Sequence, residues 1–399
     1  MTPPTSLHDA APACGALPFA RTDIAVIGGG IVGMSVAGFL AHEGCEVVVL
    51  DAAIAGGSTA NAGSLHVQMQ SRFMRLFPHR VAGMERQLPL YPEAVRFWRD
   101  FEATTGGHFE LKISGGLMVA ETPQQLDFLV TKSRRERELG LSTEILGRDD
   151  LRRLAPWLGP QIVGAELCAD EGKLNPLKCN AAVRAWACRA GTTVVEPCAV
   201  RAVEPDGAGY VLHTARGPLR ARRVVVAAGA GARALMEGQG VSLPVDPEPL
   251  QMTITEAAPP YISHLVQHAE RSITLKQLAN GQVVIGGGWP ARLDAGATQP
   301  VVEFGSLAGN LALAQALVPS LAPLQVIRTW AGINAKVDGR GVLGEMPGRP
   351  RLYAAIPGDA GYTLGPLSAR IVADIVLGRE PGVDLAPYAT DRFEAAGVA

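Results

Sequence analysis

The pattern of apolar and polar positions first identifies a strand–helix–strand unit at residues 22–51. An apolar run, DIAVI at 23–27, leads through a glycine-rich turn into an uncharged helical stretch over Ile31–His42. A second apolar run, EVVVLD at 46–51, follows the helix. Two strands joined by a crossover helix within about 30 residues form a βαβ unit, so the chain is predicted to open with a parallel sheet.

Further elements follow the same reading along the chain. Helices are predicted at 84–105, 124–155, 175–190, 305–317 and 367–378, strands at 194–223, 222–232, 250–256 and 351–356, and hairpins at 109–121 and 273–285. The β/α units stand at the start, the middle and the end, with hairpin-rich stretches between them. This alternation favours two interleaved domains over two consecutive ones.

Composition and charge exclude several classes of protein. Apolar residues make up 47% and charged residues 19%, which is enough apolar sequence for a large core and too much for a disordered chain. A net charge of −2 without a basic cluster excludes a nucleic-acid partner. The six cysteines form no C-x-x-C pair, so we expect reduced thiols, no metal site and a cytoplasmic location.

No targeting or membrane segment is predicted. Residues 1–20 lack the basic start and long apolar run of a signal peptide and are interpreted as a flexible tail. Residues 24–41 contain no charge over eighteen positions, which is the length of a membrane span. Five glycines interrupt this stretch and its first half has strand character, so a transmembrane helix is rejected.

The strongest motif is a dinucleotide-binding fingerprint. Gly28, Gly30 and Gly33 form G-x-G-x-x-G between the first strand and its helix. The glycines allow a tight turn, close approach of a pyrophosphate and close packing of the helix, whose N-terminus offers free N–H groups to phosphates. Asp51 ends the second strand 18 residues after Gly33, where an acid accepts hydrogen bonds from a ribose.

Three separated segments favour FAD over NAD as the dinucleotide. The loop after Asp51 offers short polar groups at Ser58 and Asn61 and close backbone approach at Ala62 and Gly63. A strand ending in Ala-Ala-Gly at 227–229 would cover the nucleotide from its other side. A third glycine-rich turn, at 358–365, precedes another helix and can offer N–H groups to a ring carbonyl.

These motifs resemble the FAD-dependent amino acid oxidase family that includes D-amino acid oxidase, glycine oxidase and sarcosine oxidase. The resemblance covers nearly all of residues 23–378. It rests on VIGGGIVGMSVAGFLA at 26–41, GGSTANAG at 56–63, GGLMVAET at 115–122, ADEGKLNP at 169–176, VVVAAGAGA at 224–232, GQVVIGGG at 281–288, TWAG at 329–332 and GDAGYTLGP at 358–366. The segment NAGSLHVQ at 61–68 and the GYTLGP ending most resemble the FAD-carrying subunits of bacterial opine oxidases, with the glycine-oxidising subunit of cyanide synthase next.

The resemblance implies a fold and an activity. The expected fold is mixed α/β and α+β: a Rossmann-type FAD-binding domain with a parallel sheet, interleaved with an antiparallel-sheet substrate domain. The first would comprise 21–83, 146–232 and 326–395, and the second 84–145 and 233–325. The implied reaction oxidises a C–N bond of an amino acid or a secondary, opine-like amine to an imine by hydride transfer to flavin, and hydrolysis follows. Relatives of this kind often assemble with a second, electron-carrying subunit.

By the same resemblance, cofactor contacts fall on fifteen positions. These are Gly28, Gly30, Gly33, Asp51, Ser58, Asn61, Ala62, Gly63, Val200, Ala228, Gly229, Gly361, Tyr362, Thr363 and Leu364. Monomeric sarcosine oxidases hold their flavin through a C-terminal cysteine. No cysteine follows Cys198 in this chain, so non-covalent FAD is expected.

The chain departs from the family at the substrate carboxylate. Many relatives follow the W-x-G segment with Leu-Arg-Pro, whose arginine grips the carboxylate, but Asn334 stands in that place here. A bidentate clamp is therefore lost. Arg328, Lys276, Arg72 and Arg75 remain open as alternative anion partners.

Three residues are the candidates for catalysis. His66 lies three residues after Gly63, beside the expected flavin ring, and could adjust the protonation of an amine. Asn334 follows the Trp-Ala-Gly turn. Lys276 lies in a strand, where an inward charge is costly without a function. Each could instead be structural: a loop-packing histidine, a turn amide and a solvated lysine.

Two other functions stay open. The same fold could carry a 2-hydroxy acid oxidase or dehydrogenase, or a non-catalytic FAD-bearing scaffold subunit. Bleaching of the flavin by amines or by hydroxy acids would separate them.

Overall fold

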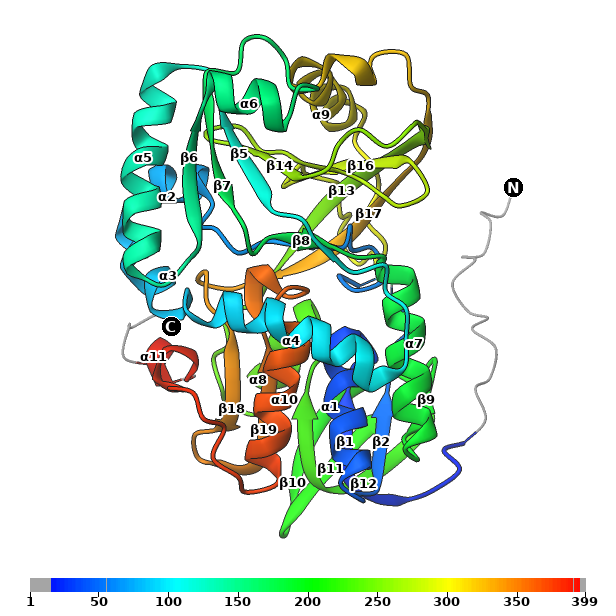
Figure 1. The fold of residues 1–399 in the computed structure, drawn as a ribbon. Coiled ribbons are helices and arrows are strands. Elements are labelled where there is room, and N and C mark those ends of the chain that lie inside the picture. The colour runs from blue at the N-terminus through cyan, green and yellow to red at the C-terminus, as the bar shows by residue number, and fades with distance from the viewer. Residues whose placement is uncertain (1–15, 55, 390, 395–399) are drawn as a thin grey trace, which may run out of the picture.

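Two eight-stranded sheets organise the protein, in a computed structural model that describes residues 16–54, 56–389 and 391–394. Figure 1 shows them one above the other. The chain crosses between them repeatedly, which confirms the predicted combination of a Rossmann-type unit with an interleaved antiparallel unit. Residues 1–15 of the predicted tail lie outside the described residues.

The first sheet contains the predicted βαβ unit. Its strands are β1 (Arg21–Ile27), β2 (Val47–Leu50), β9 (Thr193–Val195), β10 (Val200–Asp206), β11 (Gly209–Thr214), β12 (Gly217–Val226), β18 (Val342–Met346) and β19 (Arg349–Ile356). Strand β1 pairs in parallel with β2 and β12, and β12 with β19, so apolar side chains fill both faces of the sheet centre. Helices α1 (Ile31–His42), α4 (Leu90–Thr105), α7 (Pro176–Arg189) and α10 (Gly365–Val376) pack together as one layer.

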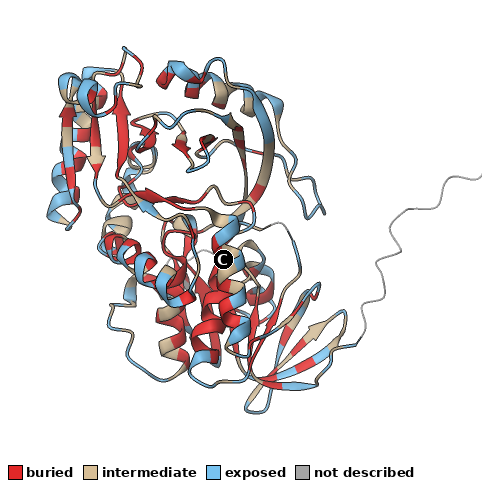
Figure 2. Cartoon of the chain, turned by 45° about the vertical axis from the view of Figure 1, so that its right-hand side comes forward, coloured by how far each residue is buried: buried red, intermediate tan, exposed pale blue. Residues whose placement is uncertain are grey.

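The second sheet runs in the order β17-β13-β16-β15-β14-β5-β7-β6. Its strands are β5 (Gly116–Ala120), β6 (Thr143–Gly147), β7 (Gly164–Cys168), β13 (Asp246–Ala257), β14 (Leu265–His268), β15 (Thr274–Gln277), β16 (Gln282–Gly286) and β17 (Val326–Lys336). Every neighbouring pair is antiparallel except β14 and β5. Helix α5 (Pro123–Glu138) packs on β5, β6 and β7, and α9 (Phe304–Leu317) on β16. Figure 2 shows that the inner faces of these layers are buried.

A small third sheet lies between the two large ones. It consists of β3 (Ser64–Leu65), β8 (Gly172–Lys173) and β4 (Lys112–Ile113). The shorter helices are α2 (Ser71–Leu76), α3 (Val81–Gln87), α6 (Arg148–Leu154), α8 (Ala232–Glu237) and α11 (Asp391–Glu394). Through β3 the predicted cofactor loop joins segments from two other parts of the chain.

Three predicted elements differ from the structure. The helix expected over 124–155 is α5, β6 and α6, because Gly140 adopts φ +94° after α5 and the next segment pairs with β7. The helix expected over 84–105 is divided between α3 and α4. The expected hairpin at 109–121 was wrong, because β4 pairs with β8 and β5 pairs with β7 and β14.

Sheet membership also differs from the predicted grouping of segments. Strands β7 and β17 fall within 146–232 and 326–395, which the sequence grouped with the nucleotide-binding unit, yet both pair in the second sheet. Conversely, α4 falls within 84–145 but packs on α10. Alternating polarity identified these elements, but it carries no information about which strand pairs with which.

Candidate cofactor and substrate site

The turn after β1 is built from glycines that no other residue can replace. Gly28 has φ +108°, and a Cβ atom there would lie 2.5 Å from the Ala227 carbonyl oxygen. A Cβ atom at Gly33 would lie 1.9 Å from the Gly28 carbonyl oxygen. Because Ile27 and Val226 are register partners, the turns after β1 and β12 lie side by side, which brings Gly28 next to Ala228 and Gly229.

A cavity of about 510 Å³ opens over this turn. Gly29, Gly30, Asp51 and Ser58 line it together with Asn180. A Cβ atom at Gly29 would lie 2.5 Å from Asp51 Oδ2, and one at Gly30 would lie 2.8 Å from Ser58 Oγ. The space exists only because side chains are absent there, as a closely approaching pyrophosphate requires.

The loop after Asp51 is tied to the third predicted turn. Asn180 Nδ2 donates to the Ser58 carbonyl at 2.9 Å, and the Tyr362 hydroxyl donates to Asn180 Oδ1 at 3.1 Å. The His66 backbone N–H donates to Thr363 Oγ1 at 3.1 Å. The structure therefore brings the segments around 58–66 and 361–364 together, far apart as they are in sequence.

A stack of buried side chains supports the third turn. Trp98 lies parallel to the Tyr362 ring, with 5.6 Å between centroids, and its Nε1 donates to the Thr363 carbonyl at 2.9 Å. Leu364 is buried and immediately precedes α10. Gly361 lies just before Tyr362 in the same turn. The Trp98 indole packs against one side of the turn at 361–364, and the other side of that turn is left for a ligand.

Strand β17 crosses the same turns from the second sheet. Trp330 Nε1 donates to the Ala60 carbonyl at 2.8 Å, and Ile333 forms a bridge with Gly56. A Cβ atom at Gly332 would lie 2.2 Å from Ala60 Cβ. The same strand contacts the short turns at 229–231 and 358–360, so the three predicted segments converge under one strand.

Four other predicted contacts lie as follows. Asn61 Oδ1 accepts the Gly63 N–H at 2.6 Å, which folds Ala62 into a tight turn. Gly63 has φ +75°, and a Cβ atom there would lie 2.2 Å from the Leu174 carbonyl oxygen. Val200 begins β10, at the opposite end of the first sheet from β9, and does not line the described cavity.

His66 and Lys276, two of the three catalytic candidates, lie together. His66 Nε2 is 3.4 Å from Thr274 Oγ1 on β15, and Lys276 Nζ donates to Ser64 Oγ at 3.0 Å. Burial and, secondarily, the Lys276 charge lower the pKa of His66 to about 3. Burial, followed by the nearby Lys173 charge, lowers the pKa of Lys276 well below its usual value. Burial therefore disfavours the charged form of both nitrogen bases.

Asn334, the third candidate, lies apart from that pair. It is on β17, and the strands β13 and β16 separate β17 from β15 in the sheet. Its Nδ2 donates to Glu248 Oε2 at 3.2 Å, and Lys336 Nζ donates to Glu248 Oε1 at 3.0 Å. Burial, followed by the Glu248 charge, raises the pKa of nearby Asp359 to about 7. Sequence reasoning missed Glu248 and Lys336, since only the β13–β17 pairing places them beside Asn334.

Known proteins resemble this chain over nearly its whole length. Residues 23–375 match the DAO family model, described as FAD dependent oxidoreductase. The chain belongs to this family of FAD-dependent oxidoreductases. It is 27% identical to glycine oxidase of Geobacillus kaustophilus over 93% of this chain and 97% of that one, and 26% identical to an opine oxidase subunit of Agrobacterium tumefaciens over 94% and 98%. The crystal structure of the Geobacillus glycine oxidase superposes with a TM-score of 0.78 and 26% identity, covering 94% of this chain and 99% of that chain.

The cavity over the glycine turn of this FAD-dependent oxidoreductase fits its cofactor. FAD is the cofactor of the family, and the space that side chains leave over Gly29 and Gly30, with Asp51 and Ser58 at its edge, suits a dinucleotide. Ser58 Oγ also accepts the Ile31 N–H at 2.9 Å, at the N-terminus of α1. Residues at 28–33, 51–63, 228–229 and 361–364 would hold the cofactor.

The cations considered for a substrate carboxylate are dispersed. Arg75 is paired with Glu270 at 2.7 Å. Arg328 is exposed, and its guanidinium lies 5.8 Å from the centre of the Trp330 ring. Arg72 is exposed on α2, and Lys276 is bonded to Ser64 as described. Lys336 lies on the same strand as Asn334, two residues further along β17, whereas Arg328 lies six residues before Asn334.

A buried polar cluster behind His66 escaped sequence reasoning. Lys132 Nζ donates to Glu136 Oε2 at 2.9 Å and to Glu166 Oε2 at 2.7 Å, and all three side chains are fully buried. Burial opposes the charge on Lys132, but the two carboxylates outweigh it and raise its pKa. Burial raises the pKa of Glu166 to about 8, despite Lys132. Glu171, also fully buried, lies 3.9 Å from His66 Nδ1.

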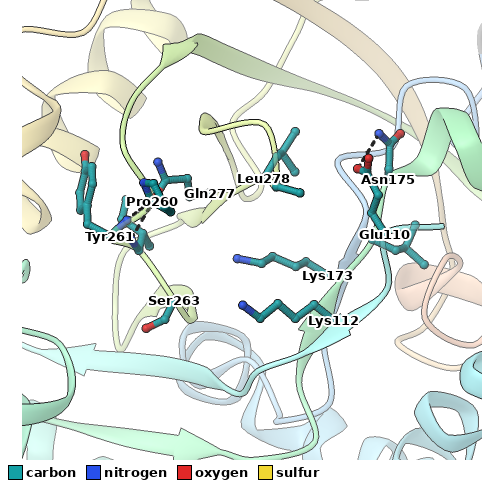
Figure 3. A pocket seen from close by; sticks show the side chains of 12 residues that line it. Glu110, Lys112, Lys173, Asn175, Pro260, Tyr261, Ser263, Gln277 and Leu278 are labelled. Carbon is teal, nitrogen blue, oxygen red and sulfur yellow. Dashed lines mark hydrogen bonds between the residues drawn. The ribbon is translucent and has the colours of Figure 1, made fainter. Parts of the chain in front are cut away.

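A second cavity, of about 440 Å³, is lined by Lys112 and Lys173 of the small sheet. Figure 3 shows Lys112 and Lys173 reaching into it side by side, toward Ser263 and Tyr261. Burial, followed by the Lys112 charge, lowers the pKa of Lys173 to about 8. Strand pairing of Lys173 with Ser64 connects this cavity to the site that holds Lys276.

Across the described residues, every helix is too short or too polar to span a bilayer.

Proposed function

We propose that this FAD-dependent oxidoreductase oxidises the C–N bond of an amino acid or secondary amine to an imine, which water then hydrolyses. Membership of the family over residues 23–375 and the similarity to glycine oxidase carry the proposal, and the low pKa of His66 favours an amine over a hydroxy acid. A 2-hydroxy acid must lose its hydroxyl proton to a base, and a histidine that stays neutral far below pH 7 is a poor base. A neutral amine needs chiefly alignment with the acceptor, so a site whose histidine is a poor base favours an amine.

The residues of the chain have separable roles in this proposal. Bound FAD supplies the hydride acceptor. His66 Nδ1 is buried and lies 3.9 Å from Glu171 Oε1, so the other ring nitrogen, Nε2, is the one proposed to accept an amine N–H. The backbone N–H of His66, bonded to Thr363, keeps the ring at the third cofactor turn. Lys276 Nζ, bonded to Ser64 Oγ at 3.0 Å, ties β15 to the loop that carries His66.

We further propose an opine-like secondary amine as the substrate and a second, electron-carrying subunit as the partner. The similarity to the Agrobacterium opine oxidase subunit over nearly the whole of both chains supports both points. The replacement of the carboxylate-binding arginine by Asn334, whose amide is bonded to Glu248, supports a substrate other than a simple α-amino acid.

Anaerobic mixing tests the activity. The purified, flavin-loaded protein is mixed with octopine, nopaline, glycine, sarcosine, D-proline and 2-hydroxyglutarate, and the flavin absorbance is followed. We expect bleaching by an amine. Bleaching by the hydroxy acid alone would refute the proposal in favour of hydroxy acid oxidation. Flavin binding with no bleaching by any compound would favour the scaffold function instead.

A histidine variant tests the role of His66. We expect His66→Asn to retain FAD and to slow bleaching by about 100-fold, the size of loss that misalignment of a bound substrate can cause. His79→Asn, at an exposed histidine, is the matched control and should reduce at the wild-type rate. An unchanged rate in His66→Asn would remove His66 from the mechanism.

A further inference from the structure

One buried carboxyl group receives four N–H donors next to His66. Glu171 Oε1 accepts the backbone N–H groups of Val67 at 2.8 Å and Gln68 at 3.1 Å. Glu171 Oε2 accepts Gln68 Nε2 at 3.1 Å and Gln267 Nε2 at 2.8 Å. The side chain is fully buried. The segment that follows His66 is thus bonded directly to a residue 104 positions later in the chain.

The donor set is fully satisfied only by an ionised carboxylate. Each oxygen of Glu171 accepts two hydrogen bonds, which uses the acceptor capacity that two carboxylate oxygens offer. A glutamine has one oxygen and one NH₂ group, so in either orientation two of the four donors would face a donor. A protonated carboxyl group has the same defect on one oxygen.

The neighbouring strand leaves room for this group. Gly116 lies on β5, and a Cβ atom there would come within 1.8 Å of Glu171 Oε2. An alanine at 116 would therefore displace the carboxylate without removing its charge.

The same segment is held at a second point by the buried cluster. Glu136 Oε1 accepts the Met69 N–H at 2.5 Å, and Lys132 Nζ donates to Gln68 Oε1 at 3.4 Å. Reorientation of the Gln68 amide would break its bond to Lys132. The amide therefore cannot turn to accommodate a donor at position 171 without further loss.

We propose that Glu171 is a positioning residue for the reaction: its ionised carboxylate clamps the backbone of Val67 and Gln68 and thereby holds His66 at the cofactor turn. The inference rests on the proposed function. It assigns the glutamate of the ADEGKLNP motif a role that acts through His66 rather than on the substrate.

The clamp depends on pH, because Glu171 titrates near neutrality. Burial raises its pKa to about 7, although the N–H donors oppose this. The charged or titratable groups that face it are His66 from the loop, Lys132 from α5 and Cys168 from β7. Burial keeps His66 neutral and raises the pKa of Cys168, so neither changes charge near pH 7.

Beyond Lys132 lie the two carboxylates of the buried cluster, Glu136 and Glu166. The pKa of Glu166, raised by burial to about 8, places its titration on the alkaline side of that of Glu171. Protonation of Glu171 below pH 7 puts a donor where an acceptor is required, so the clamp should loosen on the acid side.

Amide hydrogen exchange tests the clamp without any substrate. Protection of the amides of Val67 and Gln68 is measured in flavin-loaded wild type, Glu171→Gln and Gly116→Ala between pH 5.5 and 8.5, corrected for intrinsic exchange. Both variants should lose protection about tenfold or more, the ratio expected for a lost hydrogen bond to a charged acceptor. The wild type should lose it below pH 7. Glu256→Gln is the matched control, because Glu256 also accepts a backbone N–H, from Gln325, at an exposed site.

The reductive half-reaction completes the test. In Glu171→Gln the rate of flavin reduction by the amine should fall, and the acid-side decline of the wild-type profile should disappear. Unchanged protection at Val67 and Gln68, or an unchanged rate and pH profile, would overturn the proposal. If no amine reduces the wild-type flavin, the proposed function fails first and the positioning role falls with it, even where exchange shows the clamp. The wild-type pH series decides the matter should a variant not fold.

Discussion

The buried carboxyl group of Glu171 should make the stability of the protein depend on pH in a way that Glu171→Gln removes. Its pKa is raised from 4.5 to about 7, chiefly by burial. Between those values the folded protein binds a proton that the unfolded chain does not. The folded state therefore loses stability as pH rises through this interval, and the loss is complete above pH 7.

The size of the effect follows from the same interval. At about 1.4 kcal/mol for each pH unit, the interval between 4.5 and about 7 corresponds to about 3 kcal/mol. About 2 to 3 kcal/mol of this falls between pH 5 and pH 8. Glu171 is fully buried, so solvent screening does not reduce the figure.

Urea unfolding at pH 5, 6, 7 and 8 measures this pH dependence of stability. The free energy of unfolding of the wild type minus that of Glu171→Gln should decrease by about 2 to 3 kcal/mol from pH 5 to pH 8, with little change above pH 7. The difference between wild type and Glu256→Gln should stay constant. A difference for Glu171→Gln that is independent of pH, or that grows with pH, would show that burial does not govern this carboxyl group.

Three further substitutions have defined outcomes. Gly28→Ala should abolish FAD binding, measured as the flavin-to-protein absorbance ratio, because the new Cβ atom would collide with the backbone of Ala227. Gly44→Ala is the control: Gly44 also has a positive φ but has open space around it, so this variant should retain flavin. Lys132→Met should lower the free energy of unfolding by about 3 to 5 kcal/mol, because two buried carboxylates lose their cation; Lys178→Met, at a half-exposed pair, should cost about 1 kcal/mol or less by the same urea assay. Lys276→Met should raise the melting temperature, because a fully buried amine bonded only to a serine among the described residues costs desolvation energy, and a lowered melting temperature would contradict this.

The nucleotide-binding unit could be predicted from sequence because its signals are local. The strand, the glycine turn, the helix and the terminal acid occur within thirty residues, and each has a steric or hydrogen-bonding reason visible in the residue types. The structure places the helix at Ile31–His42, as expected. The meeting of the three glycine-rich turns was predicted from their glycines and short polar side chains, and contacts such as His66 to Thr363 support it.

Strand pairing could not be predicted in the same way. The segments at 112–113 and 116–120 are close in sequence and β-like, which suggests a hairpin, but Gly115 adopts φ +82° and directs them into different sheets. Likewise the strand at 143–147 has too few residues and too many polar neighbours to be separated from the helices on either side.

The buried charges were the hardest features to find. Lys132 and Glu136 are spaced four apart on a helix rich in charge, a pattern that usually marks a solvated face. They are buried because Glu166 faces them from β7, a strand that sequence alone did not place beside that helix. Glu171 belongs to the ADEGKLNP motif, but nothing in that motif reveals which side chains will surround its carboxylate.

The repeated passage of the chain between its two sheets bears on how the protein is made. Strand β1 pairs early in the chain with β2, but its other partner is β12, with Arg21 opposite Arg220, and β12 needs β19 at 349–356. During synthesis the first strand therefore waits until most of the polypeptide has left the ribosome before its sheet can be completed. Half-made chains expose apolar strand edges throughout that interval, so this enzyme should place a heavy demand on chaperones for its size.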